Sequence, residues 1–171
     1  MKFEDVEVKI NKPYPELTNI EEDVTTVNIL KNLANGKFGE LAGSSQYIFQ
    51  SVVADKTEEE IASIFEEIGV VEMLHLDMLM HAISEFGGIP KYEDSNGNFF
   101  NTVSLNYSIK LKDMLDGNIR AESMAIESYK NAIMRVKNKS LKALFERIIE
   151  DEMRHLEIFK RIRDNVQFMS L

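Results

Sequence analysis

Apolar residues recur at the spacing of amphipathic helices in four long runs of this chain. The runs predict helices over residues 25–54, 57–87, 108–136 and 140–163. Thr57 and Glu60 have the spacing of a capping box, so we expect the second helix to begin there. Residues 1–24 contain Pro13 and Pro15 and lack this periodicity, which predicts an extended arm packed on the helices or on a partner subunit.

The lengths of the connections between these helices predict their topology. Turns of two or three residues join the first helix to the second and the third to the fourth, so each pair should form a hairpin. The second helix is separated from the third by about 20 residues, which at ~3.3 Å per residue can span the length of a bundle. Two hairpins joined by one long crossover predict an all-α, ferritin-like four-helix bundle. We therefore divide the chain into an arm (1–24), the bundle (25–165) and a C-terminal tail (166–171).

Two segments within the predicted helices are near copies of each other. Residues 72–77 read Glu-Met-Leu-His-Leu-Asp, and residues 152–157 read Glu-Met-Arg-His-Leu-Glu. A Glu–Tyr pair with seven-residue spacing lies upstream of each segment: Glu40 with Tyr47, and Glu122 with Tyr129. Residues three or four positions apart share a helix face, so each segment directs a carboxylate and an imidazole to one point.

Together these motifs supply the ligand set of a two-metal carboxylate site in a four-helix bundle. The six residues are Glu40, Glu72, His75, Glu122, Glu152 and His155. We expect each near the middle of its helix, so that all meet at one level. Four buried carboxylates would repel one another, whereas two divalent cations cancel their charge. Mixed oxygen and nitrogen donors suit iron(II) or manganese(II). The alternative, solvated side chains on helix surfaces, is common for a single Glu-x-x-His and is disfavoured by the repeat.

Composition and charge exclude several other classes. At 171 residues, 44% hydrophobic and 29% charged, the chain can form one domain with a substantial core. We expect no membrane partner, and the N-terminus lacks the apolar stretch of a secretory signal, which favours a cytoplasmic location. A net charge of −9 disfavours nucleic acid as a partner. The chain has no cysteine, which excludes thiolate sites and a built-in rubredoxin-type centre, so a reductive reaction would need an external electron donor.

Over residues 25 to about 165 the sequence resembles bacterioferritins and rubrerythrins. The resemblance rests on Gly39-Glu40-Leu41, Gln46-Tyr47, Glu72-Met73-Leu74-His75, Glu122, and Asp151-Glu152 with His155. It implies that Glu72 and Glu152 bridge two metals. Glu40 and His75 would complete one metal, and Glu122 and His155 the other. The bacterioferritin pattern also implies that Asp151 serves His75 from the outer shell, whereas the matching position in the first hairpin is Val71, so the two metals should be inequivalent.

The paired tyrosines have two possible roles. Tyr47 stands where bacterioferritins also have a tyrosine, and Tyr129 is its counterpart in the internal repeat. Either could donate an electron or hydrogen-bond a terminal carboxylate, and a tyrosine that is simply buried with its hydroxyl satisfied is the alternative. We take Tyr47 as the candidate catalytic residue and Tyr129 as an outer-shell residue.

Departures from these families narrow the function. Rubrerythrins carry a further glutamate one turn after the third-helix ligand, where this chain has Ala125. Met73 stands where bacterioferritins place a haem-ligating methionine, but Met153 holds the equivalent place in the other hairpin. Core or interface packing is therefore the favoured role of both methionines, and no haem is expected. Manganese catalases use a similar ligand set in longer chains.

Two classes of function follow from the resemblance. The first is a redox enzyme that reduces or disproportionates hydrogen peroxide, or oxidises iron(II) with dioxygen, at two iron or manganese ions. The second is a non-catalytic iron store of the bacterioferritin type, which requires a closed shell of many subunits. The long N-terminal arm, and the lack of a fifth helix after residue 165, favour redox chemistry in a small homo-oligomer, with a dimer preferred.

Overall fold

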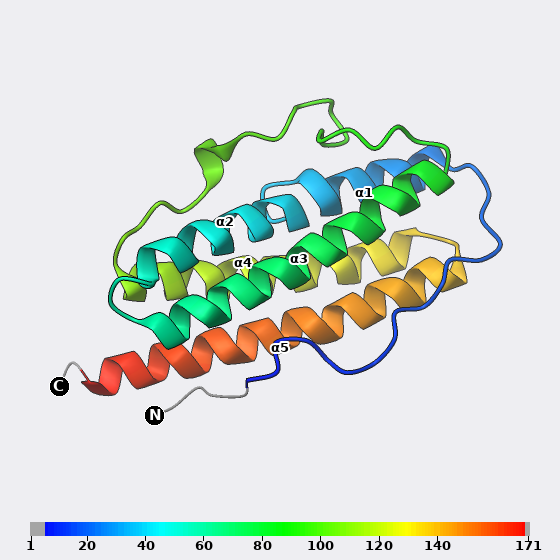
Figure 1. The fold of residues 1–171 in the computed structure, drawn as a ribbon. Coiled ribbons are helices and arrows are strands. Elements are labelled where there is room, and N and C mark those ends of the chain that lie inside the picture. The colour runs from blue at the N-terminus through cyan, green and yellow to red at the C-terminus, as the bar shows by residue number, and fades with distance from the viewer. Residues whose placement is uncertain (1–5, 170–171) are drawn as a thin grey trace.

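Helices account for nearly all of the regular structure in the computed structural model, which describes residues 6–169 (Figure 1). They are α1 (Val24–Asn35), α2 (Glu40–Ala54), α3 (Glu59–Glu85), the short 3-10 helix η1 (Thr102–Ser104), α4 (Leu111–Arg135) and α5 (Lys139–Met169). α2 packs chiefly on α3, and α4 on α5, so the chain forms two helical hairpins. A long crossover joins α3 to α4. The predicted all-α, ferritin-like fold is confirmed.

The first predicted helix is broken in two. The pattern predicted one helix over 25–54, whereas residues 36–39 separate α1 from α2. A Cβ atom at Gly39 would lie 2.4 Å from the carbonyl oxygen of Leu33, so only glycine fits this close approach. Glu40 is consequently the first residue of α2, and the prediction that it lies near the middle of a helix is wrong.

The other helices lie close to their predicted positions and differ at their ends. The predicted capping box is wrong, because α3 begins at Glu59 and the Thr57 hydroxyl donates back to the carbonyl oxygen of Ala54 at 3.5 Å. α5 continues to Met169 instead of ending at residue 163. Part of the predicted tail is therefore helical, and residues 170–171 lie outside the described residues.

A polar layer divides the hydrophobic core into two halves. One half gathers around Leu30, Leu79 and Phe145, and the other around Phe65, Leu115 and Phe159. On α3, the core residues up to Val71 belong to one half and those from Leu76 onward to the other, which leaves Glu72 and His75 between them. α5 shows the same interruption over residues 151–155. The amphipathic helices thus bury their polar motif residues at one level of the bundle.

The N-terminal arm runs along α5 in the opposite direction (Figure 1). Arg154 donates to the carbonyl oxygen of Glu7 at 2.9 Å, and Arg147 to that of Ile10 at 2.6 Å. Near the start of α5, Thr18 donates its backbone N–H to Ser140 Oγ at 2.9 Å. Residues 6–23 of the arm therefore pack on the bundle of the same chain, which is one of the two predicted arrangements. Residues 1–5 lie outside the described residues.

The crossover between α3 and α4 passes along the outer side of α1 and α2 (Figure 1). Its end is attached to α2 by a two-way amide contact. The side chain of Gln46 donates to the carbonyl oxygen of Asn106 at 2.7 Å, and the backbone N–H of Asn106 donates to Gln46 Oε1. This contact holds the crossover beside the polar layer.

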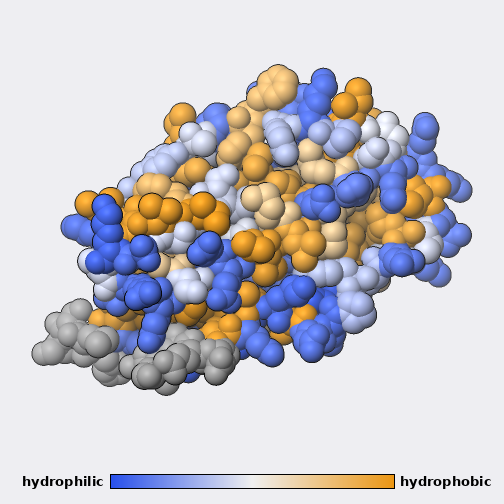
Figure 2. Space-filling model, viewed as in Figure 1, coloured by the Kyte–Doolittle hydropathy of each residue, from blue (hydrophilic) through white to orange (hydrophobic). Residues whose placement is uncertain are grey.

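Hydrophobic side chains also gather on the surface over α2 and α3 (Figure 2). The larger exposed ones on these helices are Ile48, Val52, Val70, Met73 and Leu74. Met73 and Met153 are 52% and 57% exposed, so core packing is wrong for both. Within the described residues, no helix is long and apolar enough to cross a membrane.

Candidate metal centre

The six predicted ligand residues meet in the polar layer and are all buried. Two come from α3, one from α4 and two from α5, each from the interior of its helix. Glu40 comes from the first turn of α2, where the positive end of the helix dipole favours a carboxylate. The break between α1 and α2 therefore places an anionic ligand where the backbone itself stabilises negative charge.

The ligand atoms form two overlapping groups. Glu40, Glu72, His75 and Glu152 make one group, and Glu72, Glu122, Glu152 and His155 the other. Within each group the candidate ligand atoms lie within 4.8 Å of one another. Glu72 and Glu152 belong to both groups, which is the arrangement expected of bridging carboxylates.

The two shared carboxylates each turn one oxygen toward each histidine. Glu72 Oε1 lies 2.9 Å from His155 Nδ1, and its Oε2 lies 3.9 Å from His75 Nδ1. Glu152 Oε1 lies 3.0 Å from His75 Nδ1, and its Oε2 lies 3.7 Å from His155 Nδ1. Both imidazoles thus present Nδ1 to the centre of the cluster, and a cation beside either Nδ1 would meet an oxygen of both shared carboxylates.

Several atoms at the centre of this cluster fit a metal because other polar groups do not satisfy them. Glu72 Oε1, both oxygens of Glu152, and Nδ1 of His75 and of His155 are buried without a hydrogen bond of acceptable geometry among the described residues. Buried polar atoms are rarely left in this state, and buried carboxylates need a cation or a proton. The donor set, carboxylate oxygens with two imidazoles, suits iron or manganese.

Electrostatics within the metal-free cluster point the same way. Burial, with the adjacent charge of Glu152, raises the pKa of Glu72 and of Glu122 well above the usual range. Burial would also raise the pKa of Glu152, but its contacts with the imidazoles of His155 and His75 lower that pKa below the usual range. Burial works to lower the pKa of His75, and contacts with Asp151, Glu152 and Glu40 outweigh it and raise that pKa. Without a metal, protons must therefore neutralise part of the cluster.

The paired tyrosines reach across between the hairpins to Glu40 and Glu122, the two carboxylates that each belong to one group only. Tyr47 on α2 donates its hydroxyl to Glu122 Oε1 on α4, and Tyr129 on α4 donates to Glu40 Oε1 on α2. Both rings are buried. Each of these two carboxylates thus accepts a hydrogen bond from a tyrosine of the opposite hairpin, and the two contacts follow the internal repeat of the sequence.

The outer contacts of the two histidines differ. His75 Nε2 lies 3.2 Å from Asp151 Oδ2, and Asp151 also forms an ion pair with Arg147 at 2.9 Å. Burial would raise the pKa of Asp151, but hydrogen bonds that include those from His75 and Tyr14 lower it to about 2. His155 Nε2, in contrast, is buried without a hydrogen-bond partner among the described residues.

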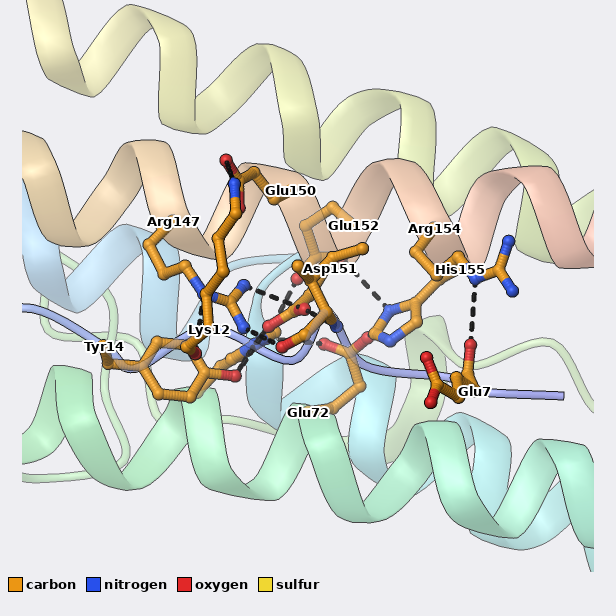
Figure 3. A network of polar contacts seen from close by, with 12 residues as sticks. Glu7, Lys12, Tyr14, Glu72, Arg147, Glu150, Asp151, Glu152, Arg154 and His155 are labelled. Atoms are coloured by element: carbon orange, nitrogen blue, oxygen red, sulfur yellow. Dashed lines mark hydrogen bonds and ion pairs between the residues drawn. The ribbon is translucent and has the colours of Figure 1, made fainter. Parts of the chain in front are cut away.

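Two contributors to this outer shell were missed by the sequence analysis. Tyr14 of the arm donates its hydroxyl to Asp151 Oδ2 at 2.6 Å, and Arg147 precedes Asp151 by one helical turn (Figure 3). The i, i+4 spacing of Arg147 and Asp151 is visible in the sequence and could have indicated their ion pair. No comparable signal marks Tyr14.

A cavity of about 100 Å³ reaches the cluster from the side of the crossover. Its inner wall includes Glu72, Glu122, Glu152 and Tyr47, and its outer wall includes Phe38 and Asn106. A single water needs roughly 10–15 Å³ of such volume, so the cavity admits small molecules to the carboxylates. Tyr129 is not part of its lining.

Several solved structures share this fold. KatB, a manganese catalase from Anabaena, matches with a TM-score of 0.84 and 22% identity over 92% of this chain and 79% of that chain. A bacterioferritin from Desulfovibrio desulfuricans, solved with its diiron site in different catalytic states, matches with a TM-score of 0.71 and 24% identity. The match covers 84% of this chain and 80% of that chain. A Rhodobacter capsulatus bacterioferritin, with a metal-free dinuclear site and haem iron, matches with a TM-score of 0.72 and 19% identity. The match covers 86% of this chain and 89% of that chain.

These structural likenesses, all below 25% identity, establish the shared fold. No curated protein matches the sequence. The sequence model of the rubrerythrin family matches residues 31–163, which span α2 to α4, the end of α1 and most of α5. The chain belongs to the rubrerythrin family.

Proposed function

We propose that this chain is a dinuclear-metal oxidoreductase that acts on hydrogen peroxide or dioxygen. One iron or manganese ion would be held by Glu40 and His75 and the other by Glu122 and His155, with the two shared carboxylates between them. The observation that carries this proposal is that each shared carboxylate turns one oxygen to each histidine. The orphaned buried atoms at the same point support it.

The cavity limits the substrate to a small molecule. Its volume of about 100 Å³ suits hydrogen peroxide or dioxygen together with a few waters. Ala125 lines this cavity at the position where rubrerythrins carry a further glutamate. A small side chain there leaves room beside Glu122 and Glu152, and the burial of the cluster keeps bulk solvent away from the reaction.

Disproportionation of hydrogen peroxide is the reaction that needs no further partner. Two bound ions would supply a store for the two electrons exchanged between successive peroxide molecules. One peroxide takes up two electrons and two protons and becomes two waters, and the second gives up two electrons and two protons and becomes dioxygen. KatB, whose fold this chain shares, is a manganese catalase. Reduction of peroxide alone, or repeated reduction of dioxygen, would instead require an external electron donor.

The chain's own residues would orient ligands and manage single electrons. Tyr47 and Tyr129 fix the terminal carboxylates through their hydroxyl groups. Tyr47 also lines the cavity, where it would meet the substrate, whereas Tyr129 does not. Tyr47 is therefore the candidate catalytic residue, able to donate one electron when the reacting site lacks one, and Tyr129 is a positioning residue.

The test is to load purified protein separately with manganese(II) and iron(II), and to count bound ions before adding peroxide. We expect two ions per chain, and one dioxygen released for every two peroxides consumed in the active metal form. Glu122→Ala is the matched control, because it removes one terminal carboxylate and should lose one ion and turnover. Consumption of peroxide and of dioxygen no faster than with free metal in the same buffer would refute the redox proposal.

Iron storage of the bacterioferritin type is the second candidate, supported by the fold shared with two bacterioferritins. Storage requires a closed shell, whereas we propose a cytoplasmic homodimer. The exposed hydrophobic side chains over α2 and α3 are consistent with self-association. The mass of the assembly by light scattering decides between them: a shell of many subunits would favour storage, and a dimer would exclude it.

A further inference from the structure

The N-terminal arm reaches the outer shell of the candidate metal centre through Tyr14. The Tyr14 hydroxyl lies 2.6 Å from Asp151 Oδ2 and 3.3 Å from His75 Nε2. The Tyr14 ring also meets the His75 imidazole edge to face, with centroids 5.9 Å apart. Since His75 presents its other ring nitrogen, Nδ1, to the cluster, Tyr14 and the cluster lie on opposite sides of one imidazole.

This segment of the arm is fixed to α5 by buried charge. Arg147 donates to the carbonyl oxygens of Ile10 and Lys12 at 2.6 and 3.2 Å, and its guanidinium lies over the Tyr14 ring, 4.5 Å from the centroid (Figure 3). The backbone N–H of Ile10 donates to Asp151 Oδ1 at 2.7 Å. Arg147 and Asp151 are 5% and 0% exposed, so water cannot easily replace these contacts. The arm therefore supplies two of the hydrogen bonds that hold the Asp151 carboxylate in place.

The second half of the site has no equivalent. The position that matches Asp151 in the first hairpin is Val71, and His155 Nε2 has no partner among the described residues. A metal-bound histidine that donates its outer N–H to a carboxylate is held in one tautomer and orientation and is a stronger ligand. Among the described residues, His75 therefore has a carboxylate at its outer ring nitrogen, and His155 has none.

We propose that Tyr14 is a positioning residue that, through Asp151, orients His75 and strengthens retention of the metal ion held by Glu40 and His75. The inference rests on the proposed binding of two ions. The arm would thereby set an order of metal retention: the ion of the His75 side is released more slowly than the ion of the His155 side. Removal of an outer-shell partner typically weakens metal binding by about 10- to 100-fold, and loss of one of several donors to Asp151 should lie at the lower end.

The test is release of metal from fully loaded protein to an excess chelator, followed by absorbance. Wild-type protein should release its two ions in two phases. Tyr14→Phe keeps the ring and removes only the hydroxyl, so it should accelerate the slow phase about tenfold and leave the fast phase unchanged. Tyr107→Phe is the matched control, because Tyr107 is exposed, meets Phe49 edge to face and does not line the cavity. It should leave both phases unchanged.

A second variant and a spectroscopic measurement keep the test decisive. Asp151→Asn should accelerate the same slow phase by a larger factor than Tyr14→Phe does. If one of the two variants folds poorly, the other still tests the inference. In protein loaded with ⁵⁷Fe, Tyr14→Phe should change the Mössbauer signal of one iron only. A general loss of stability would not produce such a selective change. Equal acceleration of both phases, or a single phase in the wild type, would overturn this inference while leaving two-metal binding intact. Fewer than two bound ions would overturn the proposed function itself.

Discussion

Replacing Tyr47 or Tyr129 with phenylalanine removes one hydroxyl from the candidate metal centre and leaves the ring packing in place. Tyr47→Phe takes the hydrogen bond from Glu122, and Tyr129→Phe takes it from Glu40. Both rings are about 1% exposed, so water cannot replace the lost donor without opening the core. The two substitutions are chemically identical and differ in which terminal carboxylate loses its donor.

The expected magnitude follows from the charge of the acceptor. Burial raises the pKa of Glu122, so in the metal-free protein this group ionises less readily than a free glutamate, and the tyrosine hydroxyl has less negative charge to stabilise. A bound metal makes it a carboxylate, and a hydrogen bond to a charged group contributes about 1.5–3 kcal/mol. At 1.4 kcal/mol for each factor of ten, Tyr47→Phe should weaken the binding of one of the two metal ions by about 10- to 150-fold.

The assay is competition with a chromophoric chelator at fixed pH, followed by peroxide turnover at saturating metal. Each variant should weaken the binding of a single ion. The control Tyr92→Phe, on the exposed crossover, should leave the binding of both ions unchanged. At saturating metal, Tyr129→Phe should recover wild-type turnover. Tyr47→Phe should retain a defect, because Tyr47 also lines the cavity. Unchanged affinity in both variants would refute the hydrogen-bond argument, and equal turnover of the two variants would refute the catalytic role of Tyr47.

Three further predictions address the ligands, the charge and the entrance. Glu72→Ala should lose both ions and Glu40→Ala one, as counted by elemental analysis; two ions retained on Glu72→Ala would exclude a shared carboxylate. The pKa of Glu72 and of Glu122 is raised in the folded metal-free protein, so their contribution to stability is full below the usual glutamate pKa and is lost as pH rises through the raised values. Urea unfolding of metal-free protein should therefore give a free energy of unfolding that decreases as pH rises above the usual glutamate range, and bound metal should reverse that trend because it requires ionised carboxylates. A Cβ atom at Gly117 would lie 2.6 Å from Asn106 Nδ2, so Gly117→Ala should displace Asn106 from the cavity mouth and speed turnover of tert-butyl hydroperoxide relative to hydrogen peroxide. The higher helix propensity of alanine should stabilise α4 by about 1 kcal/mol, which nearly offsets the lost hydrogen bond from Asn106 to the carbonyl oxygen of Asp113. A large fall in stability without a change in selectivity would contradict this reasoning.

The features that the sequence predicted are those that depend on residues close together in the chain. Apolar spacing such as that of Leu141, Leu144, Phe145 and Ile148 specifies a helix face without knowledge of its partner. The Glu-x-x-His repeat likewise places its two side chains on one face wherever the helix packs. The positions of the helices and the convergence of the six acidic and histidine residues could therefore be predicted before any tertiary contact was known.

The features that were missed depend on contacts that exist only in the folded chain. A glycine in a helix costs about 1 kcal/mol relative to alanine, which packing can offset, so Gly36 and Gly39 did not by themselves predict a break. The break depends on how closely Gly39 approaches Leu33. Tyr14 and Asp151 are 137 residues apart, and no periodicity in the arm indicates which of its side chains faces α5.

The position of the arm also has a consequence for the order of folding. Each hairpin joins neighbouring helices, whereas contacts between the arm and α5 span from 122 residues, at Thr18 and Ser140, to 147, at Glu7 and Arg154. Closing a longer loop costs more chain entropy, and native contacts of high sequence separation form slowly. We therefore expect the arm to dock last, after α5 has packed. During refolding, α2 to α5 would offer their carboxylates to metal ions before Tyr14 docks beside His75. A segment that precedes the bundle in the sequence would thus complete the assembly of the candidate centre.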